Sequence, residues 1–110
     1  MTGLGNVRIK GASGRMYTFR AYPLDTKFED FGAIYFITSR KTNSDGRIAH
    51  SRIYCGRTSD LSVPIDTPRK ASCFKLHDAN CICILPQSDE DDRTAIESDI
   101  HQNYKLLCDV

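Results

Sequence analysis

Stretches of apolar and β-branched residues, separated by polar turns, predict the strands in the first half of the chain. Residues 15–22 are rich in aromatic and β-branched side chains and are followed by a proline, so they predict a strand. Residues 33–38 are almost wholly apolar and predict a second, buried strand. Residues 40–47 are polar and contain the turn sequence Asn-Ser-Asp-Gly, after which residues 51–55 predict the returning strand of a hairpin.

The second half of the chain predicts a helix, a short strand and a final helix. Pro68 suits the first turn of a helix over residues 69–77, because the N–H that proline lacks would stay unpaired there. Residues 81–85 predict a short buried strand. Ser88 is expected to cap the last helix, whose first turn is acidic. The apolar stripe of that helix is formed by Ile96, Ile100, Tyr104 and Leu107.

Length and composition indicate one compact domain. The chain has 110 residues, of which 40% are hydrophobic and 26% charged, enough for a packed core. Four of the seven glycines lie in residues 1–14, which we expect to be a flexible or edge-lying lead-in. We therefore expect a single α+β domain over residues 15–110, a small antiparallel β-sheet flanked by helices and beginning with an extra N-terminal strand.

The apolar runs and the cysteines indicate the expected cellular compartment and the state of the thiols. No apolar run is long enough to cross a bilayer, and residues 1–6 lack the pattern of a secretory signal. We therefore expect a cytoplasmic protein with no membrane partner. The five cysteines are odd in number and contain no CxxC pair, so we expect free thiols.

One group of residues could form a zinc site, namely Cys73, His77, Cys81 and Cys83. Their spacing follows no usual zinc-ligand pattern, so we expect no zinc.

The net charge is only +1, but it is unevenly distributed along the chain. Up to Arg57 there are ten Lys or Arg against four acids, and after it there are five bases and ten acids. A basic half can bind phosphate, so DNA is an expected partner, held by weak and salt-dependent contacts. The alternative is that the two halves neutralise each other across the fold.

Two strand tyrosines and a late glutamate form the candidate site. Tyr35 ends the run Gly-Ala-Ile-Tyr, Tyr54 begins Tyr-Cys-Gly, and Glu97 lies in the last predicted helix. In this order the three motifs resemble those of the GIY-YIG nuclease superfamily, over about residues 17–109. The resemblance implies that family's small α+β fold and the hydrolysis of a DNA phosphodiester assisted by one divalent metal ion.

The resemblance also implies a role for each of these residues. Glu97 would bind one Mg²⁺ or Mn²⁺ ion, since hard cations prefer oxygen ligands. Tyr35 would help to remove a proton from the attacking water, and Tyr54 would orient water or phosphate. Gly56 would let the backbone turn out of the strand without a side chain filling the site.

A departure from the family pattern bears on activity. Family members carry an arginine in the helix after the second motif, whereas residues 62–66 contain none and include Pro64. Arg57 and Arg69 are the possible substitutes for binding the substrate. Loss of such a charge-stabilising group typically lowers a rate ~10²–10³-fold, so we expect a weakened or inactive endonuclease. The alternative is a non-catalytic domain on the same fold that binds nucleic acid or protein, with specificity supplied by a protein partner or a homodimer.

Each candidate also has a purely structural interpretation. Taken singly, Tyr35 and Tyr54 are better explained as half-buried strand tyrosines, and Glu97 as a surface carboxylate beside the apolar stripe. If the resemblance holds, both tyrosines share one face of the sheet, and their phenol oxygens lie within roughly 10 Å of the Glu97 carboxylate. Strand alternation then sends four neighbours to the other face, namely Ile34, Phe36, Ile53 and Cys55.

Overall fold

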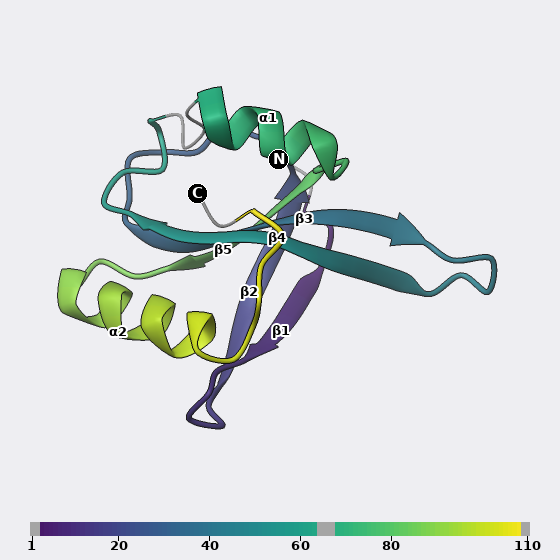
Figure 1. Cartoon of the computed structure of the whole chain (residues 1–110). Helices are drawn as coiled ribbons and strands as arrows, with labels where there is room; N and C mark the ends of the chain where they lie inside the picture. Colours follow the sequence, from purple (N-terminus) through teal and green to yellow (C-terminus); the bar gives the residue numbers. More distant parts are fainter. Residues whose placement is uncertain (1–2, 64–67, 109–110) are drawn as a thin grey trace.

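The computed structural model describes residues 3–63 and 68–108. Within these ranges the chain forms five strands and two helices (Figure 1). In chain order they are β1 (Asn6–Lys10), β2 (Met16–Pro23), β3 (Ala33–Thr42), β4 (Ile48–Thr58), α1 (Pro68–Leu76), β5 (Cys81–Pro86) and α2 (Glu90–His101). The expected α+β class with an antiparallel sheet is confirmed. No helix of the described residues is long and apolar enough to cross a membrane.

The strands form one antiparallel sheet in the order β1-β2-β5-β3-β4. The late strand β5 therefore lies between β2 and β3, at the centre of the sheet. This position explains why residues 81–84 are all buried and form a continuous apolar run, since both faces of the strand are covered. The sheet curls, and the ends of β3 and β4 project beyond it as a two-stranded hairpin (Figure 1).

Each face of the sheet is covered by one helix. On the α2 side, Ile100 lies in one buried cluster with Phe19 and Phe36. On the α1 side, Phe74 lies in a second buried cluster with Ile37. Because both faces are covered, β3 is apolar at successive positions instead of alternating between apolar and polar residues.

A register shift in the β3–β4 pair corrects one expectation about the faces. Ile37 pairs with Tyr54 and Thr38 pairs with Arg52, so Ile53 is the extra residue of a β-bulge. Ile53 consequently lies in the cluster on the α1 side, not on the opposite face as expected. The other three predicted neighbours belong to the α2-side cluster as expected: Ile34, Phe36 and Cys55.

Strand β1 lies within the lead-in that we expected to be flexible or edge-lying. Asn6–Lys10 pairs with β2 and forms one edge of the sheet, so this part of residues 1–14 is an edge strand that the sequence did not predict. Within this strand Ile9 is buried and Val7 is half-buried. Two apolar positions among polar ones and glycines are too weak a pattern to predict a strand, and pairing with β2 is what forms it. Residues 1–2 lie outside the described residues.

The last helix differs from its prediction at both ends. Asp89, not Ser88, is the N-cap, and its carboxylate accepts a hydrogen bond from a backbone N–H of the first turn. The helix ends before Tyr104, which still packs on the α2-side cluster. Leu107 is 54% exposed, so its assignment to the apolar stripe is wrong. Leu106 packs against the cluster instead.

Candidate functional site

Tyr35 and Tyr54 lie side by side on neighbouring antiparallel strands. The centroids of their rings are 6.1 Å apart, and on the α1 side of the sheet Tyr35 belongs to the buried cluster while Tyr54 packs against it. The expectation that they share one face is therefore confirmed. They differ in burial, since Tyr35 is only 4% exposed while Tyr54 is half-buried. Tyr54 is thus the more accessible of the two phenols.

Gly56 is the residue of β4 that pairs with Tyr35. A Cβ added to Gly56 would lie 2.6 Å from the Tyr35 hydroxyl oxygen and 3.0 Å from Cε2 of Tyr54. Gly56 lies within the regular strand, and its φ is not positive. The glycine is therefore needed because two tyrosines lie across it, and not, as expected, to let the backbone turn out of the strand.

The surroundings of Tyr35 keep its phenol protonated. Burial raises the pKa of Tyr35 well above its ordinary value of 10.0, and the neighbouring Tyr54, Cys55 and Glu97 raise it further. A phenol with a raised pKa stays protonated at neutral pH, so it can donate a hydrogen bond but cannot accept a proton. The electrostatics therefore oppose the expected role of Tyr35 in removing a proton from water.

Glu97 lies on α2, the helix that covers the opposite face of the sheet. Nη1 of Arg57 donates a hydrogen bond to its Oε1 at 2.7 Å, and the Glu97 and Arg57 side chains are 19% and 44% exposed. The charge of Glu97 contributes to the raised pKa of Tyr35, so the carboxylate is within electrostatic range of that phenol. Its direct contact, however, is with Arg57.

The two arginines predicted to replace the family arginine lie on different elements. Arg57 extends from the edge strand β4 and binds Glu97 of α2. Arg69 is exposed on α1, which covers the other face. The structure thus brings Arg57, but not Arg69, to the α2 side of the sheet. Pro64, in the stretch where the family arginine would fall, lies outside the described residues.

Two further residues contact β4 near Tyr54, and one of them, Lys70, was not among the sequence candidates. Nζ of Lys70 on α1 lies 4.9 Å from the centroid of the Tyr54 ring, in a cation–π arrangement. Nε2 of His101 lies 3.0 Å from the carbonyl oxygen of Cys55, so α2 is also tied to β4 near its C-terminal end. Neither contact has a local sequence signal, because each depends on which helix packs on which face.

Two of the five cysteines form a disulfide, which corrects the expectation of free thiols. Cys73 of α1 is bonded to Cys108, which lies 35 residues later. The N–H of Cys108 donates to the carbonyl of Ile53 at 2.8 Å, so the disulfide ties both α1 and the segment after α2 to β4. An odd cysteine count does not exclude one pair. The free cysteines are Cys55, Cys81 and Cys83.

The four residues considered as a zinc site are divided between the two faces of the sheet. Cys73 and His77 lie together with Cys108. The cluster on the α1 side contains Cys108, and Cys73 packs against it. Cys81 and Cys83 belong instead to the cluster on the α2 side. These four side chains therefore do not converge on one point.

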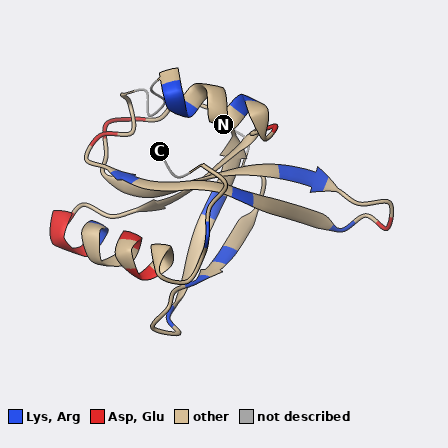
Figure 2. Ribbon diagram, viewed as in Figure 1, with Lys and Arg blue, Asp and Glu red and all other residues tan. Residues whose placement is uncertain are grey.

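The projecting hairpin carries exposed basic residues. Residues 41–49 are all exposed, so this part of the hairpin is uncovered on both faces. The basic residues along the hairpin and at its base are Arg40, Lys41, Arg47 and Arg52. Asp45 at the tip is 3.4 Å from Nε of Arg47, in an exposed ion pair. Figure 2 shows acidic residues at the opposite end of the molecule, where α2 begins.

His50 at the base of the hairpin has a positively charged environment. Burial lowers the pKa of His50 below its ordinary value of 6.5, and the charges of Arg40 and Arg52 lower it further. The imidazole is therefore neutral at physiological pH. His50 therefore adds no positive charge to the hairpin, where Asp45 pairs with Arg47. Among the described ion pairs, the one between Arg57 and Glu97 joins the basic half of the chain to the acidic half, as the expectation of mutual neutralisation requires.

No family model, curated protein or solved structure matches the chain. The likeness to GIY-YIG nucleases consequently has its basis in the sequence motifs alone.

Proposed function

We propose that the protein is a non-catalytic nucleic-acid-binding domain that holds the phosphate backbone with the β3–β4 hairpin. The observation that carries the proposal is a basic two-stranded ribbon whose residues 41–49 are exposed on both faces. A two-stranded β-ribbon fits the major groove of duplex DNA, and Lys and Arg side chains bind phosphate oxygens. A protruding arm of this kind can approach a duplex without obstruction from the body of the domain (Figure 1).

The separation of charge along the molecule supports an oriented approach. The hairpin is basic, whereas the first turn of α2 contains Glu90, Asp91 and Asp92 (Figure 2). A polyanion is attracted to the first surface and repelled by the second. Binding therefore turns the hairpin toward the nucleic acid and the start of α2 away from it.

The composition of the hairpin indicates what kind of contact it makes. Residues 41–49 contain no aromatic side chain, so this segment offers no platform on which bases could stack. Contacts to phosphate do not depend on sequence, and their affinity falls steeply as salt displaces them. We therefore expect weak binding with little sequence preference.

The arrangement of the candidate catalytic residues favours a non-catalytic role. Glu97 would have to leave its 2.7 Å contact with Arg57 before it could bind a metal ion. Tyr35 is buried, and its raised pKa opposes proton removal from water. These two observations weigh against phosphodiester hydrolysis, although the resemblance implies it.

Fluorescence anisotropy of a labelled duplex tests the proposal. Non-specific binding of this kind has a Kd of about 10⁻⁴–10⁻⁶ M at physiological salt and tightens as salt is lowered. We expect equal affinity for two duplexes of unrelated sequence and a steep loss of affinity at higher salt. No binding at low salt, or an affinity that salt leaves unchanged, would contradict the proposal.

A second candidate function is a slow, metal-dependent endonuclease of GIY-YIG type. It is supported by one observation, the contact of Tyr35 and Tyr54 across Gly56. Glu97 would then hold one Mg²⁺ or Mn²⁺ ion. Nicking of a supercoiled plasmid tests this candidate, with Glu97→Gln as the loss-of-metal variant. Nicking that needs the metal and disappears in Glu97→Gln would replace the non-catalytic assignment, and nicking that persists in the variant would mark a contaminant.

A further inference from the structure

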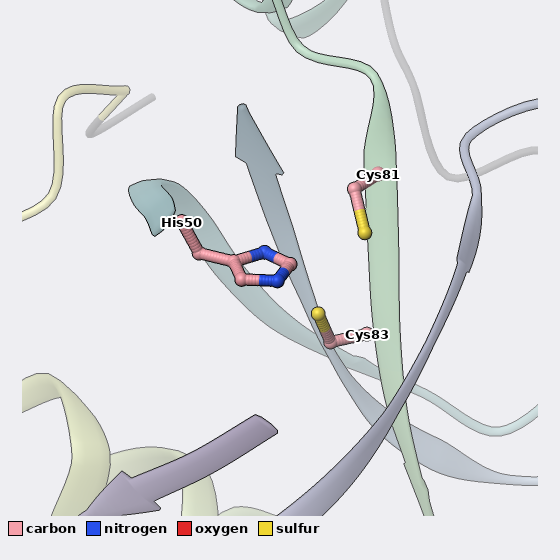
Figure 3. Close-up of side chains that lie close together, drawn as sticks. All are labelled: His50, Cys81 and Cys83. Carbon is pink, nitrogen blue, oxygen red and sulfur yellow. The ribbon is translucent and has the colours of Figure 1, made fainter. Parts of the chain in front are cut away.

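His50, Cys81 and Cys83 bring three metal-ligating atoms within 4.8 Å of one another, away from the tyrosine pair. Cys81 and Cys83 are alternate residues of the central strand β5, so their side chains point to the same face. His50 comes from the edge strand β4. Figure 3 shows both thiols and the imidazole ring directed into the same space.

Thr38 fixes the orientation of the imidazole. It lies on β3, between the strands that carry the other three residues, and it is 1% exposed. Its Oγ1 is 2.9 Å from Nδ1 of His50. Because Nδ1 is engaged by Thr38, Nε2 is the ring nitrogen left to bind a metal ion. A hydrogen bond to the second ring nitrogen is the usual way in which proteins orient a metal-binding histidine.

We infer that His50, Cys81 and Cys83 form a zinc-binding site that joins β4 to β5 across β3. Sulfur and imidazole nitrogen are the ligands that Zn²⁺ prefers, and two thiolates balance its charge. Zn–S and Zn–N distances of about 2.3 and 2.1 Å put the two sulfurs and the nitrogen of a tetrahedral site about 3.6–3.8 Å apart. Atoms that already lie within 4.8 Å reach that separation by small side-chain rotations.

The site has three protein ligands, which leaves the fourth position of a tetrahedral ion for water or an external ligand. Arg40, the cross-strand partner of His50, has a buried Nε with no hydrogen-bond partner among the described residues. A hydroxide or other anion bound to the zinc ion is the kind of group that this guanidinium stabilises. The site therefore resembles an open zinc centre more closely than a closed structural one.

Titration of the full chain with Co²⁺, followed by displacement with Zn²⁺, tests the inference. Thiolate ligands give Co²⁺ an intense charge-transfer band in the near ultraviolet, and tetrahedral coordination gives it strong visible bands. The spectrum therefore reports the ligand type and the geometry together. We expect one Co²⁺ per chain with both features, and their loss when one equivalent of Zn²⁺ is added.

Variants assign the ligands. Cys83→Ala and His50→Ala each remove a ligand and should weaken binding by more than the ~10–100-fold that loss of an outer partner costs. Thr38→Val removes such an outer partner and should weaken binding within that range. Cys55→Ala is the matched control, because it removes a buried free thiol of the α2-side cluster. His77→Ala controls for the disulfide side, and both controls should keep the spectrum.

Circular dichroism without metal shows whether each variant is folded. If Cys83→Ala does not fold, His50→Ala carries the test, because His50 is only half-buried and lies on an edge strand. The inference is overturned if the wild-type protein gives no thiolate band, if folded His50→Ala binds as tightly as the wild type, or if only monovalent copper binds.

Discussion

The hydroxyl of Tyr35 lies so close to Gly56, its cross-strand partner, that a methyl group on Gly56 would be 2.6 Å from the hydroxyl oxygen. Gly56, the last residue of the motif Tyr-Cys-Gly, is thus required because Tyr35 of the first motif packs directly against it. Packing between the two strands therefore explains both the tyrosine of the first motif and the glycine of the second, and this explanation does not depend on catalysis.

Gly56→Ala is expected to destabilise the fold by about 1–3 kcal/mol, the usual cost of overpacking. Adding Tyr35→Phe removes the hydroxyl oxygen, the atom closest to the new Cβ of residue 56, and should restore part of the lost stability. The recovery is only partial because Cζ of the ring lies 2.7 Å from that Cβ. Urea denaturation measures both effects. Ser51→Ala on the exposed part of β4 is the control and should stay within about 0.5 kcal/mol. Wild-type stability in Gly56→Ala would refute the packing argument.

The ion pair of Arg57 and Glu97 is expected to couple β4 to α2 by about 0.5–1 kcal/mol, because solvent screens both partly exposed side chains. A double-mutant cycle of Arg57→Gln and Glu97→Gln measures this coupling. The coupling should shrink at high salt. The Arg47–Asp45 pair, whose side chains are 84% and 57% exposed, is the control and should show a weaker coupling. Equal coupling in the two pairs would contradict the expectation.

Asp99 is expected to make stability depend on pH in the acid range. Hydrogen bonds from Tyr17 and Ser13 lower its pKa below the ordinary value of 3.8. Since the folded-state pKa is the lower one, this stabilisation is present above the unfolded-state pKa and is lost as pH falls through the folded-state pKa. Asp99→Asn should therefore lower the urea midpoint at neutral pH and converge with the wild type in acid. The exposed Asp25→Asn control should follow the wild type, and a constant gap between Asp99→Asn and the wild type would contradict this account.

Reduction of the Cys73–Cys108 disulfide is expected to lower the free energy of unfolding by about 4 kcal/mol. The bond closes a loop over a sequence separation of 35 residues, and loop closure in the unfolded chain sets the size of the effect. Urea denaturation with and without reductant measures it. The variant Cys73→Ser/Cys108→Ser should be insensitive to reductant, and a wild-type protein that is equally insensitive would show that the bond contributes no stability.

Local signals were enough to predict most elements of the fold. The apolar run before the hairpin, the Asn-Ser-Asp-Gly turn and the acidic start of the last helix act over neighbouring residues, so the sequence alone reveals them. β1 was missed because pairing with β2, not its own residues, holds it in place. The position of β5 between β2 and β3 is likewise set by long-range pairing.

The candidate site was predictable only where the hairpin determines it. The juxtaposition of Tyr35 and Tyr54 follows from two strands joined by one turn. The bulge at Ile53 shifts the register within those strands without any proline or glycine to mark it. The contact of Arg57 with Glu97 depends on which face α2 covers, and neither spacing nor periodicity specifies that.

The salt dependence of DNA binding by Lys41→Gln/Arg47→Gln tests the proposed function most directly. Each phosphate contact contributes about 0.9 to the slope of log affinity against log salt, so the double variant should lower that slope by about 1.8. Lys27→Gln/Arg69→Gln is the matched control, because it removes the same charge from exposed positions in the β2–β3 loop and on α1. We predict a reduced slope and weaker binding for the hairpin variant alone. Binding through the β3–β4 hairpin would be contradicted if the hairpin variant keeps the wild-type slope, or if the slope of the control variant falls by the same amount.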